Sequence, residues 1–124
     1  MRENSHALLG KMDSRKTATQ TIGSYGSHSI VNAHREASGQ AEIHENKADI
    51  MFIEGGEASI VIGGRVPDAK TTAPHEMRGS KIEGGDRQTV RPGDVLHIPA
   101  KTPHQFVLEP GQKIDYYTVK VVTP

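Results

Sequence analysis

Short runs of alternating apolar and polar residues, separated by glycine and proline, fill most of the chain. Residues 40–45 alternate strictly, with Glu42 and His44 on the same face. Residues 114–122 alternate in the same way. A period of two is typical of strands that bury one face. The pattern therefore predicts a protein built from short, half-buried β-strands.

Turn residues divide these runs into a series of predicted strands. We expect roughly eight or nine, in antiparallel sheets, because no long crossover helix separates them. The clear ones are residues 17–25, 29–36, 40–45, 49–54, 57–62, 95–98, 104–109 and 114–122. Gly55-Gly56 is interpreted as the tight reversal of a hairpin. A double-sheet barrel is the natural closure of such strands.

Two segments depart from this pattern. Residues 65–91 lack clear periodicity, so we predict a functional flap or an excursion with one or two short strands. Residues 2–15 carry a short apolar stripe after a capping Asn4 or Ser5, which predicts the one helix. The expected organisation is a helical segment over 1–16 and a single barrel domain over 17–124.

Composition narrows the class of protein. The chain has 124 residues, no Cys and a formal net charge of zero. The missing Cys excludes disulfides, thiolate metal sites and a Cys nucleophile. A balanced charge and the lack of a long apolar run make nucleic-acid and membrane partners unexpected. We expect a cytoplasmic protein, with a processed periplasmic form as the alternative.

The run 93–99, Gly-Asp-Val-Leu-His-Ile-Pro, is followed by Thr-Pro-His at 102–104. This spacing resembles the second signature of the cupins, and residues 39–56 resemble a degenerate form of their first signature. The resemblance implies an all-β fold, the cupin-type double-stranded β-helix or jelly-roll barrel. It also implies a metal pocket at the mouth of the barrel.

The resemblance carries a ligand set with it. His44 corresponds to the first His of the family's metal set, Asp49 to its Glu and His104 to its last ligand. Asn46 stands where a second His would be, and the family's later Asn falls on Leu108. Two imidazoles and a carboxylate suit a divalent ion such as Zn, Mn, Fe or Ni. The alternative is an emptied barrel in which His44 and His104 only make hydrogen bonds.

Three functional hypotheses follow from this resemblance. The first is a metal-dependent enzyme of isomerase, lyase, decarboxylase or dioxygenase type that acts on a small polar molecule. Glu42, His34 or Tyr116 would then move the proton. The second is a non-catalytic cupin module that binds a small ligand or a metal. The third, a purely structural domain, is disfavoured by the long charged stretch over 65–91.

Further residues have weaker assignments. Arg35, Arg78, Arg87 and Tyr116 could hold a substrate carboxylate, although no spacing singles one out. His97, between apolar neighbours, is expected to be partly buried and hydrogen-bonded.

The strand faces also bear on association. Inward Asp49 and His44 would direct the apolar side chains of Ile43, Ile50 and Phe52 outward. An exposed apolar sheet face of this kind favours a homodimer.

Overall fold

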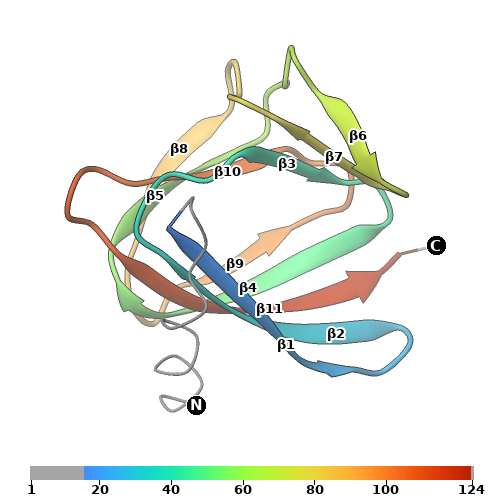
Figure 1. The fold of residues 1–124 in the computed structure, drawn as a ribbon, viewed down its shortest axis with the longest axis horizontal. Coiled ribbons are helices and arrows are strands. Elements are labelled where there is room, and N and C mark those ends of the chain that lie inside the picture. The colour runs from blue at the N-terminus through green and yellow to red at the C-terminus, as the bar shows by residue number, and fades with distance from the viewer. Residues whose placement is uncertain (1–15, 124) are drawn as a thin grey trace.

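The computed structural model describes residues 16–123, which form strands and their connections (Figure 1). No helix in this part of the chain is long and apolar enough to cross a membrane. The strands are β1 (Thr17–Ser24), β2 (His28–Arg35), β3 (Ala41–His44), β4 (Lys47–Gly56), β5 (Ala58–Ile62), β6 (Lys70–Ala73), β7 (Glu76–Gly79), β8 (Asp86–Val90), β9 (Val95–Ile98), β10 (His104–Val107) and β11 (Ile114–Val122). The all-β prediction is confirmed. The helix predicted over 2–15 lies outside the described residues.

The strands form two antiparallel sheets that face each other (Figure 1). One sheet has the order β1-β2-β11-β4-β9, and the other has the order β6-β7-β3-β10-β5-β8. Strands distant in sequence become neighbours, as when β11 lies between β2 and β4. This arrangement fits the jelly-roll barrel predicted from the sequence.

Alternation along β4 shows how the chain sorts its side chains. Asp49, Met51 and Ile53 are 1%, 3% and 3% exposed, whereas Phe52 between them is 38% exposed. On β10, His104 and Phe106 are both buried and point the same way. The interior therefore carries polar side chains as well as an apolar core.

The apolar part of the interior is one continuous cluster contributed by both sheets. Burying its aliphatic and aromatic side chains is the main favourable contribution to folding. Phe106 stacks on Tyr116 with ring centroids 4.7 Å apart, which ties β10 to β11 across the barrel. The cluster comprises Ala33, Met51, Ile53, Ala58, Ile60, Val90, Ile98, Phe106, Leu108, Ile114 and Tyr116.

Gly56 has a different role from the one predicted. Strands β4 and β5 lie in different sheets, so Gly55-Gly56 does not form a hairpin but carries the chain from one sheet to the other. Gly56 has φ +79°, and a Cβ there would lie 1.9 Å from the carbonyl oxygen of Lys113. The hairpin prediction was wrong because a glycine pair marks a reversal without showing which strands it joins.

Residues 65–91 are more regular than predicted. They contain the whole of β6, β7 and β8, where one or two short strands were expected. Strand β7 pairs with β3, and β8 pairs with β5. Strand β7 is thereby placed directly beside the strand that carries His44.

The outer face of β4 and β9 is partly apolar. Phe52 and Val95 are cross-strand partners and are 38% and 60% exposed. Ile43 and Ile50 are half-buried. A homodimer remains a prediction. His97 on β9 is exposed, so the prediction that it is partly buried was wrong.

Candidate metal centre

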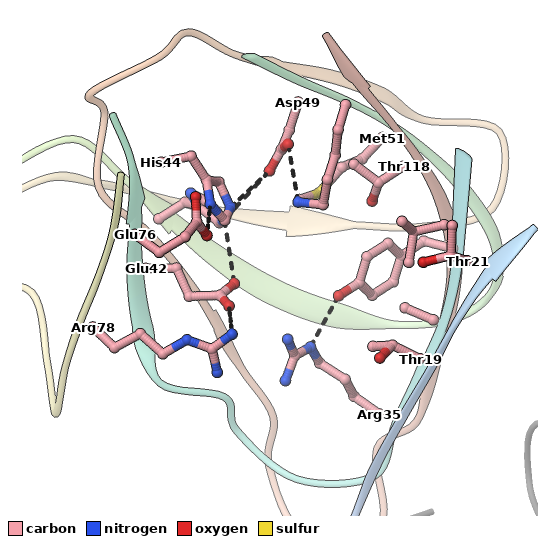
Figure 2. A pocket seen from close by; sticks show the side chains of 15 residues that line it. Thr19, Thr21, Arg35, Glu42, His44, Asp49, Met51, Glu76, Arg78 and Thr118 are labelled. Carbon is pink, nitrogen blue, oxygen red and sulfur yellow. Dashed lines mark hydrogen bonds and ion pairs between the residues drawn. The ribbon is translucent and has the colours of Figure 1, made fainter. Parts of the chain in front are cut away.

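A pocket of about 270 Å³ lies between the two sheets and contains several of the predicted site residues (Figure 2). Its wall includes the inward faces of β2, β4 and β11 from one sheet and of β3, β7 and β10 from the other. The described residues that line it are Thr19, Thr21, Val31, Ala33, Arg35, Glu42, His44, Asp49, Met51, Glu76, Arg78, His104, Tyr116, Thr118 and Lys120.

Three potential metal ligands meet on neighbouring strands. Glu42 and His44 alternate along β3, and Glu42 is the cross-strand partner of His104 on β10. One ligand atom from each of these three residues lies within 4.8 Å of the others. The two imidazole rings are 5.1 Å apart, centroid to centroid. The two-residue alternation and the register thus create the group.

Asp49 approaches this group from the opposite sheet. Its Oδ2 lies 3.3 Å from His44 Nε2 and 3.6 Å from His104 Nε2. Its other oxygen, Oδ1, accepts a hydrogen bond of 3.2 Å from Nζ of Lys120, its cross-strand partner on β11. Asp49 is only 1% exposed, so Lys120 supplies the positive charge that a buried carboxylate needs.

Several polar atoms at the centre of the group are unsatisfied. His44 Nε2, Asp49 Oδ2 and both ring nitrogens of His104 are buried and have no hydrogen-bond partner within residues 16–123. The short distances from Asp49 Oδ2 to the imidazoles therefore do not form good hydrogen bonds. Buried polar atoms are almost always paired, and a coordinated cation would satisfy His44 Nε2, Asp49 Oδ2 and one ring nitrogen of His104. The residues present thus fit a divalent metal ion.

Glu76 fixes the orientation of His44. Its Oε1 lies 2.6 Å from His44 Nδ1, and the two residues are cross-strand partners on β7 and β3. A carboxylate can only accept, so Nδ1 donates the hydrogen bond and Nε2 is left to face Asp49. A carboxylate behind a metal-binding imidazole is a common arrangement, because it sets the tautomer and raises the basicity of the ligand.

The carboxylates of the group are held in their ionised form. Burial raises the pKa of Glu42, but the adjacent His104 imidazole and the Arg35 guanidinium outweigh it, and the pKa lies well below its usual range. Burial also raises the pKa of Asp49, but His44 and Lys120 bring it below the ordinary value. Ionised carboxylates are the form that binds metal ions.

His44 has the opposite tendency. Burial lowers the pKa of His44, whereas the adjacent Asp49 carboxylate raises it by more, so the net change is upward. The same negative charges that favour an imidazolium would also favour a metal cation in its place. Metal binding here would therefore release a proton.

The structure places some of the predicted ligands and proton carriers together in the pocket and others outside it. His44, Asp49 and His104, the predicted ligands, lie close together, and their binding of a metal remains a prediction. Glu42, predicted to move a proton, stands within the ligand group itself. Asn46 lies in the turn between β3 and β4, outside the set of pocket-lining residues, and its part in metal binding remains a prediction.

The other two predicted proton carriers are separated by the sheet. Tyr116 lines the pocket and accepts a hydrogen bond of 3.0 Å from Nε of Arg35. His34 does not line the pocket, because its neighbours Ala33 and Arg35 on β2 take the inward positions. Instead, His34 bonds to Asp115 at 2.6 Å and to Glu36 at 2.8 Å.

Sequence reasoning missed Glu76 and Lys120. Both bond to predicted ligands, and both depend on strand pairings that join residues far apart in the chain. Glu76 and Arg78 are two residues apart, as side chains on one face of a strand are. The four residues of β7 are too few to show a clear alternation, so the sequence did not reveal this strand. Of the arginines considered, Arg35 and Arg78 line the pocket, whereas Arg87 is exposed on β8.

No protein-family model matches the chain, and no curated protein matches it. Solved structures do. The chain is similar to a cupin-2 domain protein of Rhodospirillum rubrum, with a TM-score of 0.63, 15% identity, and coverage of 86% of this chain and 60% of that one. The chain is also similar to the polyketide cyclase RemF of Streptomyces resistomycificus, with a TM-score of 0.62, 20% identity, and coverage of 86% of this chain and 66% of that one.

The DMSP lyase DddQ of Ruegeria pomeroyi DSS-3 is also similar, with a TM-score of 0.62, 17% identity, and coverage of 86% of this chain and 47% of that one. The chain thus spans between 47% and 66% of the length of these three proteins. At such identities the likeness concerns the fold alone, and the fold of this chain is that of a small cupin-type domain.

Proposed function

We propose that this chain binds a divalent first-row metal ion through His44, His104 and Glu42, and acts with it on a small polar molecule. Zn, Mn, Fe and Ni all accept this mixture of imidazole and carboxylate ligands. Asp49 is the fourth ligand or the anionic neighbour that balances the charge. Asn46, outside the pocket lining, is left out of this ligand set.

One observation carries the proposal. His44 Nδ1 is held by Glu76 at 2.6 Å, whereas its Nε2 and both nitrogens of His104 are buried without a partner in the part of the chain that the structure describes. A structural histidine is expected to use its buried nitrogens. An imidazole oriented from behind and left open in front, as His44 is, has the arrangement of a metal ligand.

A bound ion would polarise a carbonyl or stabilise an enediolate oxygen of the substrate. The protein's own groups then have distinct parts. Glu42, ionised and paired with Arg78 at 3.3 Å, is better suited to ligation than to accepting a proton. Tyr116 can donate a hydrogen bond to a substrate oxygen, because burial raises its pKa and keeps the hydroxyl protonated.

The class of reaction rests on analogy. A polyketide cyclase and a DMSP lyase are among the proteins similar in fold. Isomerase, lyase or dioxygenase chemistry on a small molecule is consistent with a pocket of about 270 Å³, which is at the small end for ligand sites. Fold alone does not choose among these reactions.

Metal retention tests the proposal. The purified protein is loaded with Zn²⁺, Mn²⁺ or Ni²⁺, dialysed, and analysed for metal content. We expect retained metal in the wild type and a loss of affinity of at least about 100-fold in His44→Ala and His104→Ala, since even outer-shell changes cost 10- to 100-fold. His97→Ala, an exposed histidine on β9, is the matched control and should retain metal.

The outcomes separate the alternatives. A wild type that retains none of the three metals contradicts the proposal and favours an emptied barrel. Retained metal, with turnover on a panel of sugar acids, keto acids and catechols, supports a metal-dependent enzyme. Retained metal and ligand-induced thermal stabilisation without turnover would favour a binding module instead.

A further inference from the structure

A second, more open cavity adjoins the metal pocket, and we call it the outer groove. Its volume is about 440 Å³, and the described residues that line it are Gln40, Thr72, Ala73, Glu76 and Arg78. Glu76 and Arg78 also line the metal pocket, so the two cavities meet at β7. In Figure 2 these two side chains lie on the side of the pocket that holds the ligand group. A molecule held at that group therefore has room to extend into the outer groove.

An irregularity in β6 shapes the outer groove. Thr71 pairs with Met77 of β7, and Ala73 pairs with the preceding residue, Glu76, so Thr72 is an extra residue in its strand. Adjacent side chains of a regular strand point to opposite faces, yet Thr72 and Ala73 both line the groove. A β-bulge re-aims side chains in this way and is common next to active sites. It brings a hydroxyl to the groove and keeps the small side chain of Ala73 beside Glu76.

The charged side chains of the outer groove are engaged with the ligand group. Glu76 Oε1 accepts a hydrogen bond from His44 Nδ1 at 2.6 Å, and the Arg78 guanidinium lies 3.3 Å from Glu42 Oε1. The two charges have opposite signs, so the described lining residues give the groove no net fixed charge. A charged ligand group therefore gains little from entering it.

The uncharged polar side chains indicate what the groove accepts. Thr72 contributes a hydroxyl and Gln40 an amide, and both residues are exposed. Each of these groups can donate and accept hydrogen bonds, as an alcohol does. The lining thus suits the hydroxyls of an uncharged carbon chain.

We propose that the outer groove binds the distal hydroxyls of an uncharged polyhydroxy carbonyl compound, whose carbonyl oxygen faces the Glu42–His44–His104 group. This assignment rests on the proposed function and adds to it the substrate class and two residues that select it, Thr72 and Gln40. The metal pocket of about 270 Å³ is small for a ligand site, and the groove supplies the room that a longer chain needs.

The test compares ketoses of different length on the zinc-loaded protein. Dihydroxyacetone is the short probe, and D-xylulose and D-ribulose are the long ones. The compound 1-hydroxypentan-2-one has the carbon chain of the pentuloses without their distal hydroxyls. NMR titration measures each dissociation constant. We expect at least one pentulose to bind at least about 10-fold more tightly than dihydroxyacetone and than 1-hydroxypentan-2-one, because it adds two or more hydrogen bonds.

Variants of the groove locate this preference. Thr72→Val and Gln40→Leu each remove one hydrogen-bonding group and should weaken pentulose binding by about 2- to 10-fold, the effect of one neutral hydrogen bond. Ala73→Leu fills the groove and should weaken it by more. All three should leave the affinities for dihydroxyacetone and zinc unchanged. Thr71→Val, on the same strand but outside the groove lining, is the matched control and should bind every probe as the wild type does.

The inference and the metal proposal fail in different ways. A wild type that does not bind zinc contradicts the proposed function. A protein that binds zinc but binds the pentuloses no more tightly than dihydroxyacetone or 1-hydroxypentan-2-one overturns the groove assignment alone. Tighter binding of D-xylulose 5-phosphate than of D-xylulose overturns the uncharged class. Groove variants that keep the full affinity for the pentuloses, or that lose affinity for dihydroxyacetone equally, also overturn the assignment.

Discussion

Two histidine–carboxylate clusters lie on opposite faces of this barrel and differ in one respect. His34, on the outer side of β2, is 4% exposed and has both ring nitrogens bonded, to Asp115 at 2.6 Å and to Glu36 at 2.8 Å. His44, on the inner side of β3, is 7% exposed and has only Nδ1 bonded, to Glu76 at 2.6 Å. Its Nε2 lacks a partner within residues 16–123.

This difference shows which observation identifies a site. Burial and nearby carboxylates are common to both clusters, and either histidine could be chosen as functional from the sequence. The outer cluster is complete by itself, since carboxylates that accept from both nitrogens describe an imidazolium held between two anions. The inner cluster is incomplete without a further positive group. Unsatisfied hydrogen-bonding capacity therefore separates the two clusters, whereas residue type does not.

The largest expected effect is on metal-dependent stability. At a free metal concentration 100 times the Kd, a ligand of the folded state alone stabilises it by about 2.7 kcal/mol. We expect His34→Ala to keep this increment in full and His44→Ala to lose most of it. Unfolding by urea, with and without Zn²⁺, measures the increment in each protein. An equal increment in both variants would contradict the distinction between the clusters.

A smaller effect is expected from the carboxylate behind His44. Glu76→Ala should weaken metal binding by about 10- to 100-fold, because the imidazole loses its orientation and part of its basicity. Glu76→Gln, whose amide oxygen can still accept from Nδ1, should lose less. Zinc titration against a competing chelator measures both variants. Glu57→Gln, an exposed glutamate paired with Arg91, is the control, and unchanged affinity in Glu76→Ala would refute the positioning role.

The smallest expected effect is the pH dependence from the outer cluster. Burial lowers the pKa of His34, whereas its hydrogen bonds to Glu36 and Asp115 raise it by more, so the net pKa lies above 6.5. This contribution to stability is fully present below about pH 6.5 and is lost as the pH rises through the folded-state pKa. Urea unfolding between pH 6 and 9 should therefore show a steeper loss in the wild type than in His34→Gln. Parallel profiles would show that His34 is not held as an imidazolium.

Much of the fold could be predicted from the chain. The strands at 95–98 and 114–122 have the bounds expected from sequence, and alternation alone puts Asp49, Met51 and Ile53 on one face of their strand. Short and half-exposed strands were harder to predict from the sequence. The four residues of β6 are all exposed, so no hydrophobic period marks this strand. Its place depends on pairing with β7 rather than on its own side chains.

Part of the candidate site could also be predicted from the motif and from the alternation of its strands. His44, Asp49 and His104 lie at recognisable positions in the motif, and Glu42 shares the face of His44 by simple alternation. The orientation of His34 could not be read in this way, because an alternating strand has two faces and the sequence does not say which one lines the barrel. Glu36 lies two residues from His34 in the chain, whereas Asp115 reaches His34 only once β2 and β11 pair.

The sequence by itself determined the all-β class, the alternation of the strands and the residue types available for binding a metal. Local backbone preference and a period of two are sufficient for that, since both act between near neighbours in the chain. The tertiary structure alone decided which carboxylate faces which imidazole. Register between strands brings Glu76 to His44, Lys120 to Asp49 and Asp115 to His34. It leaves Nε2 of His44 and both ring nitrogens of His104 without a partner within residues 16–123. Such pairings join distant parts of the chain, so only the closed barrel specifies them.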